Sequence, residues 1–154
     1  MKLSGAYLAG YFDADGCINA TVTRDRYLFV RASIVGKNTS LLEYLKEMFG
    51  GNIYDMPLSK GKDVFMWVLM SKKELLDFLY YIEPYVVLKK ERVSLGIRVV
   101  ESVQEESTRP LNDGIKLLRL VAGLSMCILN QKDKTNPRET KTMSRIRRLI
   151  GCTS

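Results

Sequence analysis

The feature that most limits the fold of this 154-residue chain is a pattern, found twice, of two alternating strands followed by a helix. Between Cys17 and Val35, apolar and polar residues alternate in two runs on either side of Arg24-Asp25-Arg26, which predicts a β-hairpin. A second pair of strands is expected at 53–58 and 63–70, with a turn at 59–62. Two such hairpins favour one antiparallel sheet.

Helix signals surround both hairpins. Ser4 is a suitable cap for a first helix that runs to about Asp13. The capping boxes Ser40-Leu-Leu-Glu43 and Ser71-Lys-Lys-Glu74 each predict a helix directly after a hairpin. Beyond Pro84 the pattern is mostly helical, at 86–106, at 111–130 and from about 140 to 151. We therefore expect a single α+β domain, residues 1–154, with helices on one face of the sheet and a helical C-terminal tail.

Composition excludes several kinds of chemistry. The chain has no histidine, which removes the usual general base and the usual zinc ligand. Its three cysteines are too far apart for a zinc site or a disulfide framework. No apolar run reaches membrane-spanning length, and the N-terminus does not read as a signal peptide. An intracellular location, cytoplasmic or organellar, is expected.

The net charge of +7 is concentrated near the C-terminus. Between residues 130 and 150 there are seven basic and two acidic side chains, which is most of the excess. One interpretation is a solvated tail helix. The other is a segment that contacts phosphates of a nucleic acid.

The stretch YLAGYFDADGCI, residues 7–18, predicts a helix built for close packing. Two pairs of small residues are spaced by four, Gly5 with Ala9 and Ala6 with Gly10, which lets another helix approach closely. We find no second copy of this segment in the chain. The expected partner is therefore the same helix of a second subunit, packed about a two-fold axis.

This helix ends on two acids, Asp13 and Asp15. On a structural interpretation they only end the helix and begin a turn. On a functional one they hold a metal, because a divalent cation relieves the repulsion between adjacent carboxylates. Packing about a two-fold axis would bring both copies of Asp15 together. Mg²⁺, which takes oxygen ligands and few protein contacts, suits such a site, and other divalent metals such as Mn²⁺ would also fit.

The outward face of the predicted sheet mixes hydrogen-bonding and aromatic side chains. Such a set suits the reading of base edges in a groove, although a merely solvated face is the open alternative. Its members are Asn19, Thr21, Thr23, Arg31, Ser33, Tyr54 and Trp67.

The segment Leu8-Ala-Gly-Tyr-Phe-Asp-Ala-Asp-Gly16 resembles the motif that names the LAGLIDADG homing endonucleases. The order of hairpins and helices also resembles that family over nearly the whole chain. One motif per chain is similar to the homodimeric branch of the family. The resemblance implies a saddle-shaped sheet, with the motif helix at the dimer interface through Ala6, Ala9, Gly10 and Asp13.

The resemblance also assigns roles at the end of the helix. It implies that Asp15 binds the catalytic metal and that Ala14 offers its backbone carbonyl, while Asp13 supports the helix end. A lysine follows a Pro-aromatic-aliphatic stretch in similar members, and Lys89 matches it here as a second catalytic residue. The alternative for Lys89 is a solvated lysine at a helix start.

The chain departs from the family at one position. Many members have a glutamine at the end of the second strand, where this sequence has Gly36. A glycine cannot orient a water molecule with a side chain. Lys37, Asn38 or a basic residue elsewhere would have to do so.

The implied function is that of an intron-encoded, Mg²⁺-dependent endonuclease that cuts both strands of a long, partly palindromic DNA site. The alternatives are an RNA-splicing maturase, a DNA-binding regulator that does not cleave, and a basic structural protein. Beyond the sheet face, the expected DNA-binding residues lie in loops and in the tail: Arg24, Arg26, Lys37, Lys60, Lys62, Lys132, Lys134, Thr135, Arg138, Lys141 and Thr142.

Overall fold

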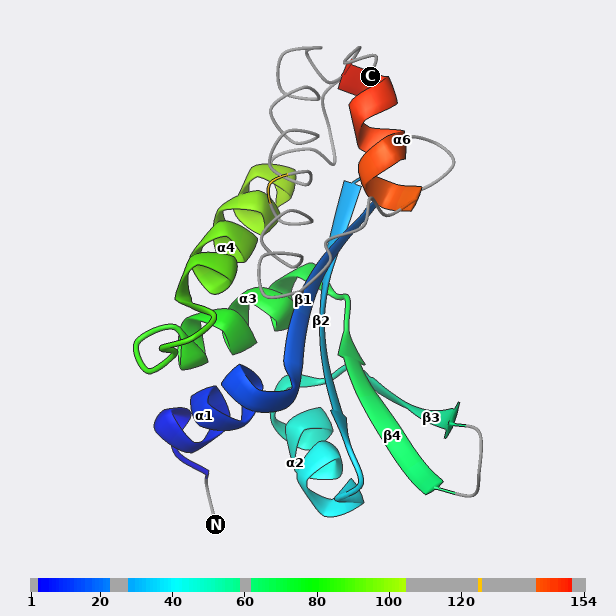
Figure 1. Ribbon diagram of the computed structural model, residues 1–154. Coiled ribbons are helices and arrows are strands. Elements are labelled where there is room, and N and C mark those ends of the chain that lie inside the picture. Colours follow the sequence, from blue (N-terminus) through cyan, green and yellow to red (C-terminus); the bar gives the residue numbers. More distant parts are fainter. Residues whose placement is uncertain (1–2, 23–27, 59–61, 105–124, 126–140, 151–154) are drawn as a thin grey trace.

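A four-stranded antiparallel sheet is the centre of the molecule (Figure 1). The computed structural model describes residues 3–22, 28–58, 62–104, 125 and 141–150. The strand order is β1-β2-β4-β3, so β2 and β4 are the inner strands of the described sheet. The strands are β1 (Gly16–Val22), β2 (Leu28–Gly36), β3 (Asn52–Leu58) and β4 (Lys62–Leu69).

Helices cover one face of this sheet, which confirms the predicted α+β class. In Figure 1, α1 to α4 lie on one side of β1 and β2, and α6 lies beside the end of β1. The described helices are α1 (Gly5–Asp15), α2 (Thr39–Phe49), α3 (Lys72–Ile82), α4 (Lys90–Gln104) and α6 (Lys141–Ile150).

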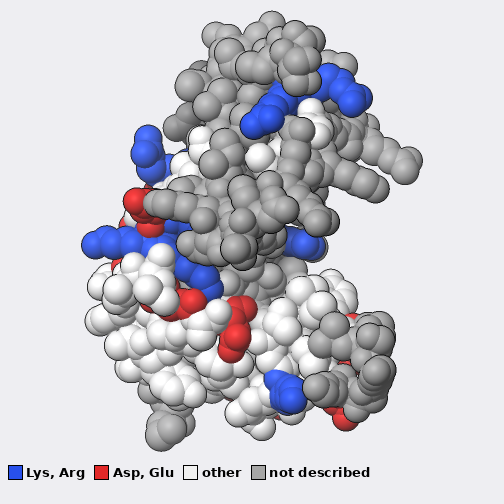
Figure 2. All heavy atoms as spheres, in the orientation of Figure 1, with Lys and Arg blue, Asp and Glu red and all other residues white. Residues whose placement is uncertain are grey.

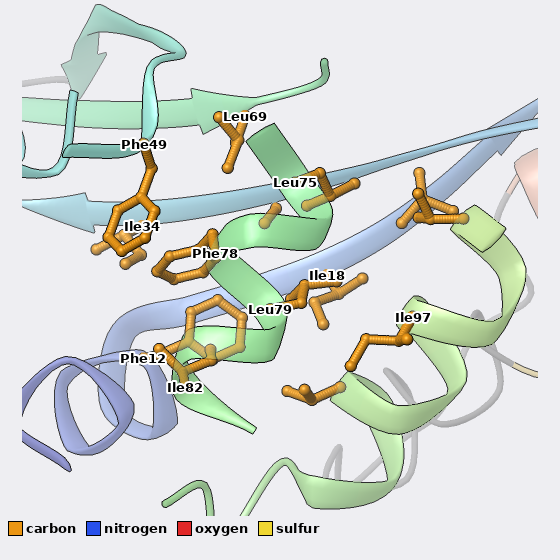
Figure 3. Close-up of a cluster of buried hydrophobic side chains, with 14 of the residues drawn as sticks. Phe12, Ile18, Ile34, Phe49, Leu69, Leu75, Phe78, Leu79, Ile82 and Ile97 are labelled. Carbon is orange, nitrogen blue, oxygen red and sulfur yellow. The ribbon is translucent and has the colours of Figure 1, made fainter. Parts of the chain in front are cut away.

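Aliphatic side chains and aromatic rings together fill the core between sheet and helices (Figure 3). Phe78 on α3 is fully buried and makes edge contacts with Phe12, Phe49 and Trp67, at ring-centroid distances of 5.6, 5.2 and 5.1 Å. Such pairs stabilise the core beyond the area they bury. Phe78 thereby joins the end of α1, the end of α2 and the middle of β4.

The alternation in β2 predicts its buried face correctly. In β4, the face that was expected to point outward is the one that packs against the helices. Val30, Ala32 and Ile34 are buried as expected. Trp67, expected on the outward face, is fully buried because its cross-strand partner Ile34 faces the helices. Its indole N–H donates to the carbonyl of Gly50, 2.9 Å away.

The helix signals were correct about the helices and less accurate about the caps. Ser4 caps α1 as predicted, because its Oγ accepts from the N–H of Tyr7. The cap of the second helix lies two residues before the predicted Ser40, at Asn38, whose side chain accepts from the N–H of Leu41. The side chain of Ser71 makes no cap hydrogen bond at α3. Gly50 and Gly51, with φ angles of 81° and 80°, end α2 as predicted.

The basic helix near the C-terminus packs against the rest of the chain. Met143 and Ile146 of α6 are buried in the main core, and α6 contacts β1. Arg148 on the same helix is exposed. The helix is therefore anchored by an apolar side, which disfavours the interpretation as a free, fully solvated tail.

Several expectations fall outside the described residues: the hairpin tip at 24–26, the turn at 59–61 and most of the helix expected at 111–130. Within the described ranges, no helix is long and apolar enough to cross a membrane.

We predict that Phe78→Ala lowers the free energy of unfolding by about 3–5 kcal/mol, because it leaves a cavity at the meeting point of three aromatic rings. Urea unfolding followed by circular dichroism measures the change. The matched control is Lys73→Ala on the exposed side of α3, which removes a surface ion pair with Asp77. The control should leave the urea midpoint nearly unchanged, and equal effects of the two substitutions would contradict this description of the core.

Candidate active site

The first helix runs into the first strand without an intervening loop. Gly16 ends α1 with an extended backbone (φ −81°, ψ 155°), and its N–H donates to the carbonyl of Phe12. A Cβ atom at Gly16 would collide with the ring of Phe12, so only glycine fits this junction. Asp13 and Asp15 are thus held between a helix end and a sheet, where the backbone has little freedom.

Asp13 binds the segment between α3 and α4. Its Oδ2 accepts hydrogen bonds from the backbone N–H groups of Val87 (2.8 Å) and Leu88 (3.1 Å), and its Oδ1 accepts from that of Lys89 (2.9 Å). Hydrogen bonds to a charged acceptor are among the stronger ones in proteins. Asp13 therefore fixes the start of α4 to the end of α1, across more than seventy residues of sequence.

Lys89 makes the return contact. Its ammonium group donates to the backbone carbonyls of Phe12 (2.9 Å), Gly16 (2.7 Å) and, at a longer distance, Ala14 (3.4 Å). These are carbonyls at the C-terminal end of α1, where a cation also interacts favourably with the helix dipole. The same ammonium lies 5.7 Å from the centre of the Phe12 ring.

The surroundings of Lys89 make it an unusual lysine. Burial lowers its pKa below that of a free lysine, and Arg92 acts in the same direction. The negative charges of Asp13 and Asp15 raise the pKa and offset part of this effect. Lys89 is therefore a positioned cation that holds its proton less tightly than a surface lysine.

Asp15 differs from Asp13 in that no described backbone group donates to its carboxylate. Its side chain is exposed, and no hydrogen bond or ion pair holds its carboxylate within the described ranges. The carbonyl of Ala14, also exposed, is its neighbour. Carboxylate and carbonyl oxygens are the ligands that hard divalent cations prefer, so these donors fit Mg²⁺ or Mn²⁺. No group of three or more acidic or cysteine side chains that could hold a metal occurs among the described residues.

Acidic and basic side chains alternate around this junction (Figure 2). On the face shown, basic and acidic side chains both reach the surface where α4 begins near the end of α1. They do not form one continuous basic area.

The predicted interface residues of α1 divide between two environments. Ala9 is fully buried inside the chain, so its side chain is not available to a second subunit, contrary to the expectation from the spacing and the family resemblance. Ala6 and Gly10 are exposed, and a Cβ atom at Gly10 would meet nothing within 4 Å. Gly5, by contrast, lies against Tyr85 and Tyr81 of its own chain.

The open face of the sheet brings together part of the predicted DNA-binding set. Asn19 and Arg31 are cross-strand partners on β1 and β2, and Tyr54 on β3 is 46% exposed. The Nε atom of Arg31 is buried and has no hydrogen-bond partner in the described part of the chain. Ser33 is on this face but nearly buried, and Trp67 is on the opposite one.

The structure leaves much of the predicted DNA-binding set undescribed. Lys37 is exposed directly after β2. The backbones of Thr21, Lys62, Lys141 and Thr142 lie in β1, β4 and α6, but their side chains are outside the described set. The remaining positions lie wholly outside the described residues: Thr23, Arg24, Arg26, Lys60, Lys132, Lys134, Thr135 and Arg138.

Sequence reasoning missed one neighbour of Asp15, the side chain of Tyr11. Tyr11 is one helical turn before Asp15, and its hydroxyl lies next to Gly36 at the end of β2. Burial raises the pKa of Tyr11, and the negative charge of Asp15 raises it further. The spacing of four residues between Tyr11 and Asp15 was available in the sequence as a signal. The contact with Gly36 was not, because it depends on how the helix crosses the strand.

We predict that Asp13→Asn and Asp15→Asn have different effects on folding. Asp13→Asn should lower the free energy of unfolding by about 1–2 kcal/mol, because a charged acceptor of three backbone N–H groups is lost. Asp15→Asn should leave stability unchanged or slightly raised, since no hydrogen bond is removed and a repulsion is relieved. Chemical denaturation of both variants without metal measures this, and an equal loss would contradict the division of roles between the two acids.

Comparison with known sequences agrees with this architecture. A family model described as LAGLIDADG endonuclease matches residues 8–96. The chain is 32% identical over 108 residues to a probable intron-encoded endonuclease, aI2, of Debaryomyces hansenii, and 35% identical over 77 residues to the intron-encoded RNA maturase bI4 of Saccharomyces cerevisiae. These alignments cover 60% and 49% of this chain but only 16% and 12% of the relatives.

Solved structures show the same fold over nearly the full chain. The archaeal intron-encoded homing endonuclease I-Vdi141I, complexed with DNA, has a TM-score of 0.73 at 18% identity, with 96% of this chain and 94% of that chain covered. The homing endonuclease I-CvuI, in complex with its target, gives 0.72 at 19% identity, with 97% and 96% covered. The LAGLIDADG homing endonuclease I-SmaMI gives 0.67 at 20% identity, with 97% of this chain but 49% of that one covered. The family match over more than half of the sequence, together with the fold, shows that this chain belongs to the LAGLIDADG endonuclease family.

Proposed function

We propose that this protein is a site-specific DNA endonuclease that hydrolyses one phosphodiester bond in each strand of a long, partly palindromic site. The observation that carries the proposal is the pair of acids on one motif. The carboxylate of Asp13 is held by three backbone N–H groups, whereas Asp15 presents an unbonded carboxylate at an exposed helix end, near the half-buried ammonium of Lys89. The family match and the DNA complexes of similar structures support it.

Asp15 and the carbonyl of Ala14 are the groups that would hold a divalent cation, with Mg²⁺ as the expected ion and Mn²⁺ as a substitute. Such a cation, when bound, stabilises negative charge on the scissile phosphate and makes a nearby water more acidic. Solved relatives are consistent with a divalent cation here, since I-CvuI was solved on its own target in the presence of Ca²⁺ and on the I-CreI target, which was not cleaved, in the presence of Mg²⁺.

Lys89 would act on the same phosphate from a fixed position. Three carbonyls at the end of α1 orient its ammonium group, so little reorganisation is needed when negative charge develops nearby. Because burial lowers its pKa, Lys89 is also better suited than a surface lysine to exchange a proton with water.

A second copy of the chain would complete the site. Ala6 and Gly10 expose a small-residue surface on α1, and Val87 and Leu88 are 76% and 79% exposed beside it in the segment that Asp13 binds. Packing this surface on itself about a two-fold axis would bury apolar side chains and bring the two Asp15 carboxylates together. The match to about half of I-SmaMI is consistent with a fold used twice.

The open sheet face would read the DNA. Asn19 and Arg31 lie on adjacent strands with Tyr54 further along the sheet, and their polar side chains would donate to bases or phosphates. Lys37 would contact phosphate near the cleavage centre, and the loops and tail predicted above would contact outer positions.

The second candidate function is RNA splicing as a maturase. The specific observation in its favour is the 35% identity to the RNA maturase bI4 over 77 residues. Such a role would use the basic and polar surfaces without requiring Asp15.

The direct test is cleavage of a DNA library with Mg²⁺, followed by sequencing of the cut ends. We expect cutting at a long, partly palindromic site. Asp15→Asn should reduce cleavage by at least a thousandfold, while its affinity for the selected DNA stays within about twofold, because the exposed carboxylate does not hold the fold. Unchanged cleavage by Asp15→Asn would contradict the proposal, and RNA-splicing activity without DNA cleavage would favour the maturase.

The proposed dimer gives a separate prediction. Gly10→Leu should leave the fold of one chain intact, because a Cβ atom there meets nothing, but it should weaken self-association at least tenfold. Analytical ultracentrifugation measures the association. Gly5→Leu is the matched control, since its side chain would collide with Tyr85 and the backbone of Tyr81 and should unfold the chain. A Gly10→Leu variant that associates as the wild type does would exclude this helix face as the interface.

A further inference from the structure

The hydroxyl group of Tyr11 occupies the space that a side chain at position 36 would fill. A Cβ atom placed on Gly36 would lie 2.5 Å from the Tyr11 oxygen and 3.8 Å from the ring carbon that carries it. The backbone of Gly36 does not have the left-handed conformation that requires glycine. The absence of a side chain at this position is therefore explained by the space that the tyrosine takes.

Tyr11 faces the same side of α1 as Asp15. The two residues are four apart on a regular helix, which places their side chains one above the other. The charge of Asp15 acts on the Tyr11 hydroxyl, as the raised pKa of Tyr11 reflects, although burial is the larger cause. The hydroxyl thus lies next to the end of β2 and within the electrostatic influence of the Asp15 carboxylate, and it stays protonated at neutral pH.

This hydroxyl has an unused donor. Tyr11 makes no hydrogen bond within the described ranges. Its hydroxyl oxygen is also not one of the fully buried atoms without a partner there, so it is reached by solvent. The side chain as a whole is only half-buried. A protonated, solvent-accessible hydroxyl without a protein partner can donate to a water or to a phosphate oxygen at the Asp15 carboxylate.

We propose that Tyr11 is a positioning residue of the Asp15 site: its hydroxyl, which occupies the space left by the missing side chain of Gly36, donates a hydrogen bond to a water molecule held at the Asp15 carboxylate. This inference rests on the proposed nuclease function, because the water is the one that attacks the scissile phosphate. Tyr11 takes no proton and forms no bond to substrate. It acts by restricting the orientation of that water.

The competing explanation is that Tyr11 only packs against β2. A packing role requires the ring and makes the hydroxyl dispensable for rate, whereas a positioning role requires the hydroxyl and its location. Tyr11→Phe keeps the ring and removes the oxygen. Gly36→Ala keeps the oxygen and displaces it, because the flexible end of the tyrosine must move away from the new methyl group.

The experiment measures single-turnover cleavage of the DNA site selected from a randomised library with Mg²⁺. Tyr11→Phe should reduce the rate about tenfold, which corresponds to the loss of one hydrogen bond. DNA affinity and melting temperature should not change, since the hydroxyl bonds to no described residue. Gly36→Ala should reduce the rate to a similar degree, and it should add no further loss when combined with Tyr11→Phe.

A second readout needs neither DNA nor metal. In protein with ¹³C-labelled tyrosine, the Tyr11 signal, identified by its absence in Tyr11→Phe, should shift in Gly36→Ala, while signals of tyrosines far from Gly36 stay in place. An unshifted Tyr11 signal would overturn the contact on which the inference stands.

The outcomes distinguish a failure of this inference from a failure of the proposed nuclease function on which it rests. Cleavage of no library site by the wild type contradicts the proposed function, and the role of Tyr11 falls with it. Cleavage by the wild type with an unchanged rate in Tyr11→Phe overturns the inference alone. Additive losses in the double variant would also overturn it, because the two residues would then act independently.

Discussion

The rest of the structure depends on a reciprocal contact between the end of α1 and the start of α4. The carboxylate of Asp13 accepts from three consecutive backbone N–H groups at 87–89, and the ammonium of Lys89 donates to carbonyls at the end of α1. Each charged group satisfies backbone atoms that the other segment leaves unpaired. Two elements far apart in sequence are locked together at the point where the helix enters the sheet.

This reciprocal contact offers a reason why one short motif carries two acids. A carboxylate that holds a fold cannot also be free to bind a cation, and under the proposed function the chain separates these two roles by two residues. Asp13 points into its own chain, and Asp15 remains exposed at the same helix end. The ring of Phe12, directly before Asp13 in the sequence, anchors the helix to Phe78 in the core. The position of the exposed acid therefore follows from core packing.

Much of the fold was predictable because its signals are local. Alternation gave the strands, Ser4 gave the start of α1, and the two glycines gave the end of α2. Trp67 was misplaced because alternation identifies two faces of a strand without saying which one the helices cover. The register with Ile34, which is a long-range property, decides that question.

The candidate site was predictable in part for the same reason. Asp13, Ala14, Asp15 and Lys89 could be named from a motif, and the structure places all four at one junction. The bonding that divides the acids, the burial of Ala9 and the contact of Tyr11 with Gly36 required the packing of helices on the sheet. Spacing on a single helix cannot show which small residues face inward.

The most direct measurement of the central claim, that Asp13 serves the fold and Asp15 serves the metal, is a crystal structure of the protein on its selected DNA site with Mn²⁺, located by anomalous scattering. The account predicts two subunits related by a two-fold axis, with Mn²⁺ bound by Asp15 carboxylate oxygens at the scissile phosphates and Asp13 still bonded to the backbone at 87–89. Manganese bound by Asp13, or bound away from both acids, would contradict it.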